Sequence, residues 1–182
     1  SPISLVVSAF APVNDGRETL TPELKSAGST LLLLELQGSV GRLGGSIAQQ
    51  VSGALGGACP DISDYPALEE LWSWLQDQAV RVSIRSLHDR SDGGLIATVS
   101  EMMFAGGKGV MLEVSESEAL IPFLFNEELG VIVEVDKDAA SHLLESLERA
   151  AIRATVVGSV IGDPEFKIRQ GESMVFESDL SQ

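Results

Sequence analysis

The sequence predicts an α/β (α+β) fold in which a mixed β-sheet is flanked by helices. Apolar runs of strand length alternate with longer segments of helical periodicity, and clusters of glycine, proline, asparagine and aspartate separate them. A chain with this alternation packs helices on one or both faces of a sheet. The 182 residues correspond to a single domain, which is long enough to fold without a disulfide or a metal.

Short runs rich in valine, isoleucine, leucine and phenylalanine predict the strands. They cover residues 4–13, 31–36, 84–88, 110–114, 130–135, 155–161, 166–169 and 174–177. The second run, Leu-Leu-Leu-Leu-Glu-Leu, is almost continuously apolar. Such a run indicates a central strand that is covered on both faces.

Five segments with a spacing of three to four residues between apolar positions predict the helices. They lie after the glycines of 38–45, over 65–81, over 92–105, over 118–125 and after Asp136, which is expected to cap the last one. The first has the apolar face Ile47, Val51 and Leu55 and ends at Gly56-Gly57. The third is apolar nearly all round, so it is expected in the interior.

The helix predicted over 65–81 is the clearest amphipathic one. Its apolar stripe consists of Leu68, Leu71, Trp72, Leu75 and Ala79. Trp74 falls off the stripe, where it either packs against a neighbouring domain or is a half-exposed surface residue.

Composition limits the classes of function. Twelve basic and 27 acidic residues give a net charge of -15, and no basic cluster occurs, so we expect neither nucleic acid nor an anionic membrane surface as a partner. Phosphate-bearing small molecules stay possible, because backbone N–H groups and Mg²⁺ hold phosphate without net positive charge. No apolar stretch approaches the roughly 20 residues of a membrane span. The lone Cys59 fits the reducing cytoplasm.

The start of the chain carries neither an initiator methionine nor the basic region of a signal peptide. It resembles a strand that is entered in the middle of a protein. We therefore expect residues 1–182 to be a single domain excised from a longer multidomain chain.

The segment His88-Asp89-Arg90-Ser91-Asp92-Gly93-Gly94-Leu95 lies between a predicted strand and the interior helix. The first N–H groups of a helix lack partners, and glycines such as Gly93 and Gly94 allow a ligand or a backbone to approach closely. Ser91 or Asp92 is expected to cap the helix, which leaves Asp89 as an oxygen ligand for Mg²⁺. The alternative is that both acids only cap and solvate the helix start. His88 is either a base or phosphate contact, or a residue that holds the turn by a hydrogen bond.

Two further turns are candidates. Gly41-Arg42-Leu43-Gly44-Gly45-Ser46 precedes a predicted helix, where its N–H groups either cradle a phosphate or let the helix pack closely on the sheet. The turn has neither a Walker lysine nor the dinucleotide spacing. Asn126-Glu127-Glu128 precedes a strand, so Asn126 and Glu127 either contact a ligand or belong to a solvated acidic turn.

The segment from His88 to Leu95 resembles the signature of the carboxyl-terminal subdomains of the aminoimidazole ribonucleotide synthetase superfamily. Other segments narrow the resemblance to the large, single-chain formylglycinamide ribonucleotide amidotransferases and to their second such subdomain. These segments are Ser8-Ala9-Phe10-Ala11, Thr19-Leu20-Thr21-Pro22, Glu101-Met102-Met103-Phe104-Ala105-Gly106 and Leu124-Phe125-Asn126-Glu127-Glu128-Leu129-Gly130.

The resemblance implies a fold similar to the C-terminal domain of aminoimidazole ribonucleotide synthetase. It implies a part in an ATP-dependent C–N ligase of purine biosynthesis, which converts formylglycinamide ribonucleotide, glutamine and ATP to formylglycinamidine ribonucleotide, glutamate, ADP and phosphate. The cofactors would be ATP and Mg²⁺, with Asp89 as a metal ligand and Ser91 as a nucleotide contact. The supporting candidates are His88, Asp92, Gly93, Gly94, Gly44, Gly45, Asn126 and Glu127.

The same resemblance implies that the partners are other domains of one chain, namely a preceding N-terminal-type subdomain with most metal ligands and a glutaminase domain. The isolated domain is therefore expected to be inactive. The cleft that it serves is either the catalytic one or one that holds a structural nucleotide. The alternatives are a non-catalytic scaffold domain of that enzyme and a sister synthetase or kinase of the superfamily.

Overall fold

The computed structural model describes residues 6–13, 15–54, 56–62 and 64–179. Its strands are β1 (Thr30–Glu35), β2 (Ile84–Arg90), β3 (Gly109–Val114), β4 (Gly130–Val135), β5 (Arg153–Ile161), β6 (Glu165–Gln170) and β7 (Ser173–Asp179). Within the described residues they form one seven-stranded sheet in the order β2-β4-β1-β5-β3-β6-β7. Strands β3 and β6 are parallel and the other neighbours are antiparallel, so the predicted mixed sheet is confirmed.

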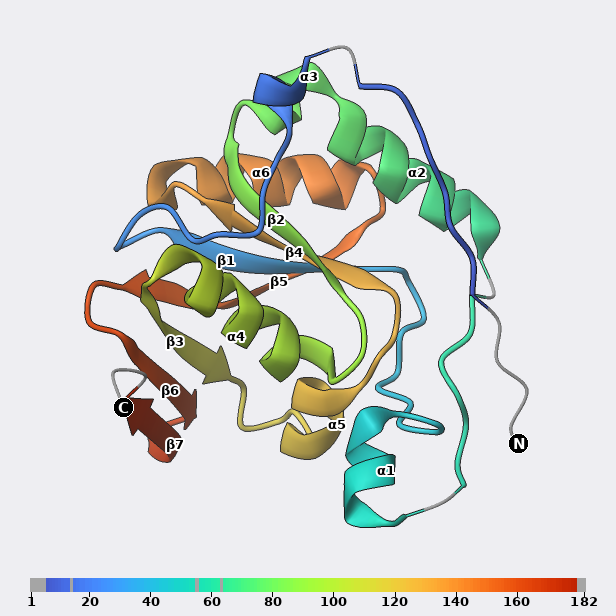
Figure 1. The fold of residues 1–182 in the computed structure, drawn as a ribbon, viewed down its shortest axis with the longest axis vertical. Coiled ribbons are helices and arrows are strands. Elements are labelled where there is room, and N and C mark those ends of the chain that lie inside the picture. The colour runs from blue at the N-terminus through green and yellow to red at the C-terminus, as the bar shows by residue number, and fades with distance from the viewer. Residues whose placement is uncertain (1–5, 14, 55, 63, 180–182) are drawn as a thin grey trace.

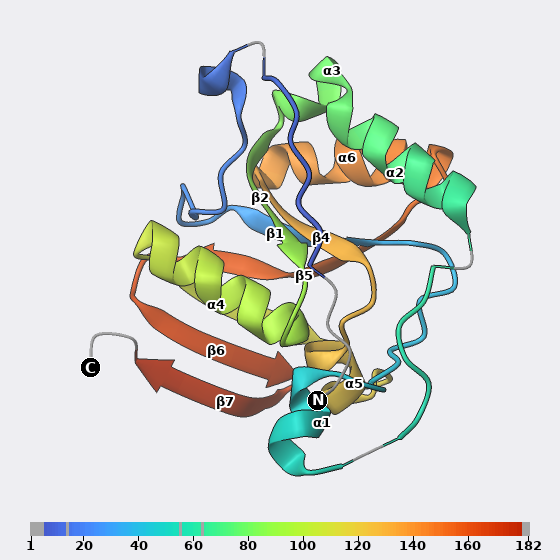
Figure 2. The ribbon, with the colours of Figure 1, turned by 45° about the vertical axis from the view of Figure 1, so that its right-hand side comes forward.

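Helices lie on both faces of this sheet (Figure 1). They are α1 (Ile47–Ser52), α2 (Tyr65–Gln76), α3 (Gln78–Arg81), α4 (Gly94–Gly106), α5 (Leu120–Phe125) and α6 (Lys137–Arg149), with a 3-10 turn at Gly16–Glu18. Helices α2 and α6 lie on one face, and α4 crosses the other with α5 at its end (Figure 2). In the described part of the chain, no helix is long and apolar enough to traverse a bilayer.

Strand β1 is central and is covered on both faces, as its composition predicts. Successive side chains of a strand point to opposite faces. Leu31 and Leu33 therefore join the cluster that contains α4, whereas Leu32 and Leu34 join the cluster that contains α2 and α6. All four leucines are at most 1% exposed. An antiparallel strand thus becomes continuously apolar because it separates two cores.

Helix α4 fills the first of these cores. Leu95, Val99, Met102 and Met103 are buried, which confirms an interior position for most of the helix. Phe104 is 67% exposed, so the prediction was wrong for the outer face of the last turn.

The predicted helix over 65–81 is two helices, with a break at Asp77. Its buried face also differs from the predicted stripe, because Trp74 is buried and Trp72 is 63% exposed. The indole Nε1 of Trp74 donates a hydrogen bond to Ser146 Oγ of α6 at 2.9 Å. Helix α2 therefore packs against α6 as well as against the sheet, which turns its buried face toward Trp74.

Two other predictions were wrong. Residues 6–13 form no strand, and Val6 and Phe10 are 89% and 95% exposed. Helix α1 ends at Ser52 with a left-handed Gly53 instead of reaching Gly56-Gly57, and its Val51 is 83% exposed. Residues 4, 5 and 55 lie outside the described residues, so the predictions there are untested.

Asp136 occupies the N-cap position of α6 as predicted, but its side chain makes no capping hydrogen bond. It accepts instead from Arg85 Nε at 2.7 Å and from Arg85 Nη2 at 2.6 Å. The ion pair competes with the cap for the same carboxylate.

A fully buried carboxylate ties the chain before β1 to the sheet. Glu134 of β4 accepts hydrogen bonds from the N–H groups of Lys25 and Ser26 at 2.8 and 2.9 Å. It also accepts from the hydroxyls of Ser29 and Ser86 at 2.6 and 3.0 Å. Four donors satisfy the charge, and this allows a carboxylate to sit in the interior.

We predict that Glu134→Leu lowers the free energy of unfolding by about 3 kcal/mol or more, because it leaves buried donors without an acceptor. Urea denaturation of the chain measures the change. The control is Glu148→Leu at an exposed position of α6, which should shift stability by no more than about 0.5 kcal/mol. Equal effects of the two substitutions would contradict the assigned role of Glu134.

Candidate functional site

Four strand ends meet at one end of the sheet. Glu35 closes β1 and pairs in register with Gly130 of β4 and Arg153 of β5, and Gly130 pairs with Arg90 at the end of β2. Glu35 is 6% exposed. Its Oε1 lies 2.8 Å from Arg90 Nη2, and its Oε2 lies 3.6 Å from Arg153 Nε. A buried carboxylate between two guanidinium groups therefore marks this end of the sheet.

Arg90 anchors the loop that follows α5. Its side chain is completely buried, and its Nε donates to the main-chain oxygen of Glu128 at 2.7 Å. Neither Nη atom has a hydrogen-bond partner among the described residues, so the contact with Glu35 is an ion pair without hydrogen-bond geometry. Burial lowers the pKa of Arg90, and the charge of Glu35 opposes that shift.

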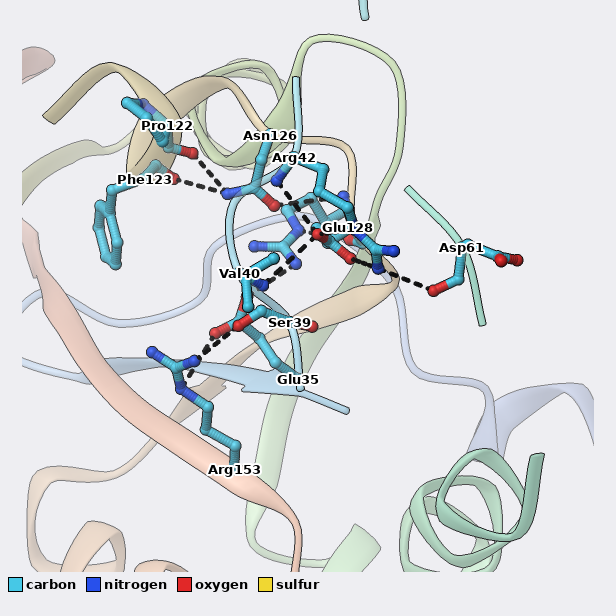
Figure 3. Close-up of polar contacts among 11 residues, drawn as sticks. Glu35, Ser39, Val40, Arg42, Asp61, Pro122, Phe123, Asn126, Glu128 and Arg153 are labelled. Atoms are coloured by element: carbon cyan, nitrogen blue, oxygen red, sulfur yellow. Dashed lines mark hydrogen bonds and ion pairs between the residues drawn. The ribbon is translucent and has the colours of Figure 1, made fainter. Parts of the chain in front are cut away.

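Glu128 holds the glycine-rich turn (Figure 3). Its Oε1 and Oε2 accept from Arg42 Nε and Nη2, both at 2.7 Å. The main-chain N–H of Arg42 adds a third bond to Oε1 at 3.1 Å, and Nη2 also donates to Asp61 O at 2.9 Å. This paired arrangement joins three loops around one carboxylate.

The environment of Glu128 keeps it ionised. Burial by itself would raise the pKa of this carboxyl, but the hydrogen bonds from Arg42 outweigh burial and hold the pKa below its ordinary value. The same hydrogen bonds raise the pKa of Arg42.

Asn126 ends helix α5. Its Nδ2 donates to Pro122 O at 2.6 Å, and its Oδ1 accepts the N–H of Glu128 at 3.2 Å. The amide is buried and its hydrogen bonds are internal. The structure therefore gives Asn126 a local role in shaping the turn.

The turn before α4 differs from the predicted capping. Gly93 is the N-cap, with a left-handed φ of 86°, and neither Ser91 nor Asp92 caps the helix. The N–H of Gly94 donates to Ser91 O at 3.0 Å. A Cβ on Gly94 would lie 2.7 Å from Asn126 O, so only glycine lets α4 begin against this backbone. Ser91 and Asp92 are exposed.

Asp89 and His88 lie at the end of β2. The Asp89 side chain is 72% exposed, and its Oδ1 lies 3.2 Å from His88 Nδ1. The other nitrogen of the imidazole, Nε2, lies 2.9 Å from Glu101 Oε2 of α4. His88 thus joins β2 to α4. This contact favours the interpretation that His88 holds the turn in place over the interpretation that it is a base or a phosphate contact.

The glycine-rich turn has few free N–H groups. Gly44 is buried and donates to Ala58 O at 2.8 Å, and Gly45 donates to Gln49 Oε1 at 3.1 Å. The N–H of Ile47 donates to Glu127 Oε1 at 2.8 Å. These groups are occupied by the protein itself, which favours close packing over a phosphate cradle.

A groove of about 1020 Å³ runs beside β2 and β4. Asp89 and Glu127 border it, while Ser91, Asp92, Gly93 and Gly94 do not. Its apolar wall comes from α2, the strands and the chain before β1, and includes Leu68, Leu71, Trp72, Leu75, Leu87, Leu129 and Val131. A second hollow, near Arg42 and Asp61, measures about 10 Å³, which is room for one water.

The described residues supply only some of the ligands that a metal ion needs. No group of three or more histidine, cysteine, aspartate or glutamate side chains with metal-binding geometry occurs among the described residues. Mg²⁺ is bound in proteins by one or two carboxylates together with substrate phosphates and water. The exposed carboxylate of Asp89 meets that requirement as one ligand of an incomplete set.

Sequence reasoning missed the ion pairs of the buried Glu35 with Arg90 and Arg153, and it missed the partner of Glu128. One signal was present, because Glu35 is a charged residue inside an apolar run. A buried negative charge requires a partner, so a glutamate at this position predicts a positively charged side chain nearby. The sequence does not say which one.

Residues 26–171 match the family described as AIR synthase related protein, C-terminal domain, and the chain belongs to this family. The chain is 37% identical over 172 residues to the probable phosphoribosylformylglycinamidine synthase, chloroplastic/mitochondrial, of Arabidopsis thaliana. That similarity covers 93% of the chain but only 12% of the length of the Arabidopsis protein.

Solved structures share the fold. PurL of Thermotoga maritima complexed with ATP matches with a TM-score of 0.73 and 18% identity, over 90% of this chain and 27% of that one. The hydrogenase maturation protein HypE of E. coli matches with a TM-score of 0.60 and 22% identity, over 90% and 52% of the two chains. The predicted resemblance to this superfamily is therefore confirmed at the level of family and fold.

We predict that stability falls in acid partly through Glu128. Its folded-state pKa is lowered, so its stabilising contribution is present above the unfolded-state pKa of about 4.3 and is lost as the pH falls through the folded-state value. Urea denaturation from pH 7 to pH 3 should show a shallower loss in Glu128→Gln than in the original chain. An identical pH dependence in both proteins would contradict the ion pair.

Proposed function

We propose that the chain supplies half of an ATP·Mg²⁺ site in the synthetase region of a phosphoribosylformylglycinamidine synthase. The exposed carboxylate of Asp89, beside the groove and the α4 turn, is the observation that carries this proposal. The 37% identity to the Arabidopsis synthase and the fold shared with an ATP complex of PurL support it.

The reaction would convert formylglycinamide ribonucleotide, glutamine and ATP to formylglycinamidine ribonucleotide, glutamate, ADP and phosphate. ATP activates the substrate amide oxygen, and ammonia released from glutamine displaces it. In this scheme Asp89 contributes one oxygen ligand to Mg²⁺, and Ser91 at the exposed turn contacts the nucleotide. The remaining ligands come from a preceding N-terminal-type subdomain, which forms the other wall of the cleft.

We predict that Asp89→Asn in the full-length protein weakens the binding of Mg²⁺·ATP by at least about tenfold, because the variant loses a charged oxygen ligand. Calorimetric titration measures the binding of the nucleotide at fixed Mg²⁺, and an assay of ADP release measures the activity. Asp138→Asn on the exposed surface of α6 is the matched control and should leave both unchanged.

A second candidate is a non-catalytic scaffold domain of the same enzyme. The internally bonded N–H groups of Gly44, Gly45 and Ile47 favour it, because a phosphate cradle needs such groups to be free. If Asp89→Asn changes neither bound nucleotide nor activity, the scaffold role is the correct one and the site proposal is wrong.

The partners of the domain would be other parts of the same chain, including the N-terminal-type subdomain and a glutaminase domain. The apolar side chains of residues 6–13 are exposed. The similarity to the Arabidopsis protein extends over 172 residues, which is longer than the part of the chain from residue 26 to residue 182. A relative therefore shares part of the segment before residue 26, where the family domain begins. This supports contact of the segment with a neighbouring domain.

We predict that Phe10→Ser leaves the stability of the 182-residue chain within about 0.5 kcal/mol, because the side chain is 95% exposed. In the full-length protein the same substitution should lower the melting temperature by several degrees, since there the ring would be buried between domains. Thermal unfolding of both proteins tests this. Equal melting temperatures of the full-length pair would refute the interdomain contact.

We propose that the working protein is cytoplasmic. Cys59 is free and exposed, which suits a chain that is kept reduced. The Arabidopsis relative carries the description chloroplastic/mitochondrial.

A further inference from the structure

The carboxylate of Glu127 lies between the starts of two helices. Its Oε1 accepts the N–H of Gly93, the N-cap of α4, at 2.8 Å. The same oxygen accepts the N–H of Ile47, the first residue of α1, at 2.8 Å. One oxygen atom therefore connects the α4 turn to the glycine-rich segment.

This position favours a carboxylate. The first N–H groups of a helix have no partner within the helix, and they carry a partial positive charge. Both bonds end on the same oxygen, so the amide oxygen of a glutamine at that place can accept the same two bonds without the charge. Substitution of Glu127 by glutamine can therefore separate the effect of the negative charge from the effect of the bond geometry.

Helix α1 depends on such polar contacts for its place. No residue between Leu36 and Ile62 contributes to either apolar cluster of the described residues. Val51 of α1 is 83% exposed. The bond to Glu127 and the ion pair of Arg42 with Glu128 are thus among the polar contacts that hold this segment beside α4.

The loop that carries Glu127 is itself fixed. Asn126 ties it to the end of α5, and the main-chain oxygen of Glu128 accepts a bond from the buried Arg90. The Cα of Gly94 packs against the backbone of residues 124–126. Glu127 consequently acts from a rigid base on the turn that presents Ser91.

We propose that Glu127 is a positioning residue, which clamps the turn from Ser91 to Gly94 and the start of α1 in one arrangement. The clamp holds Ser91 where the proposed function requires a nucleotide contact, and in that respect the inference rests on the proposed function. The clamp itself is a property of the chain without any ligand.

Amide hydrogen exchange of the 182-residue chain, followed by NMR, tests the clamp. Glu127→Ala should speed exchange at Gly93 and Ile47 by about tenfold, because a charge-assisted acceptor is lost. Glu127→Gln should stay within about threefold of the original rate, since its amide oxygen accepts the same bonds. Glu118→Ala, at an exposed position before α5, is the control and should change neither amide.

If the two amides exchange at the original rate in Glu127→Ala, the clamp is refuted. Should that variant fail to fold, Glu127→Asp serves instead, because it keeps the charge and shortens the side chain by one methylene. Faster exchange at both amides in Glu127→Asp supports the clamp, and an unchanged rate overturns it.

The effect on nucleotide is measured in the full-length protein. We expect Glu127→Ala to raise the KM for ATP about tenfold with little change in kcat, and Glu127→Gln to restore the original KM. A response to Asp89→Asn without a response to Glu127→Ala overturns the positioning role and leaves the proposed function intact. No response to either substitution refutes the proposed function, and amide exchange then decides the clamp alone.

Discussion

The buried guanidinium of Arg90 is the contact on which the arrangement of this end of the sheet depends. It lies at the end of β2, forms an ion pair with Glu35 of β1 and donates to the backbone of Glu128 before β4. Loss of one member of a buried pair leaves an uncompensated charge, which costs about 3–5 kcal/mol. The loop that contains Asn126, Glu127 and Glu128 is thus held in place by the buried, charged side chain of Arg90.

From this base, two acidic residues hold the glycine-rich turn, α1 and the start of α4 in place. Glu128 holds the glycine-rich turn through Arg42, and Glu127 holds the starts of α1 and α4. The chain has a net charge of -15, yet the carboxylates of Glu35, Glu127 and Glu128 are paired with arginines or with main-chain N–H groups. These three negative charges therefore have a structural role at this end of the sheet.

The two glycine-containing turns of the site differ in which polar groups they leave accessible to a ligand. The N–H groups around Gly44 and Gly45 are engaged by the chain itself, whereas Asp89 and Ser91 face solvent at the α4 turn. HypE and PurL share this fold at low identity, so the fold does not by itself select a reaction. The identity of 37% to a synthase and the exposed Asp89 are the features that favour a nucleotide site completed by another domain.

Periodicity was sufficient for most elements, because the apolar pattern of a strand or helix directly records which faces are buried. It identified β1, β4 and α4, and it located the turn from His88 to Leu95. It failed for residues 6–13 and for α1, where apolar residues are exposed in this chain. It also misassigned Trp72 and Trp74, because the buried face of α2 depends on the position of α6.

The sequence by itself determined the class of fold, the family and the turn that carries Asp89, since these follow from local patterns and from motif residues. Only the tertiary structure showed that Arg90 is buried against Glu35, that Gly93 caps α4 and that Glu127 joins two helix starts. The reason is that these contacts join residues far apart along the chain. Sequence spacing does not encode which of many charged residues will meet when the strands are brought into register.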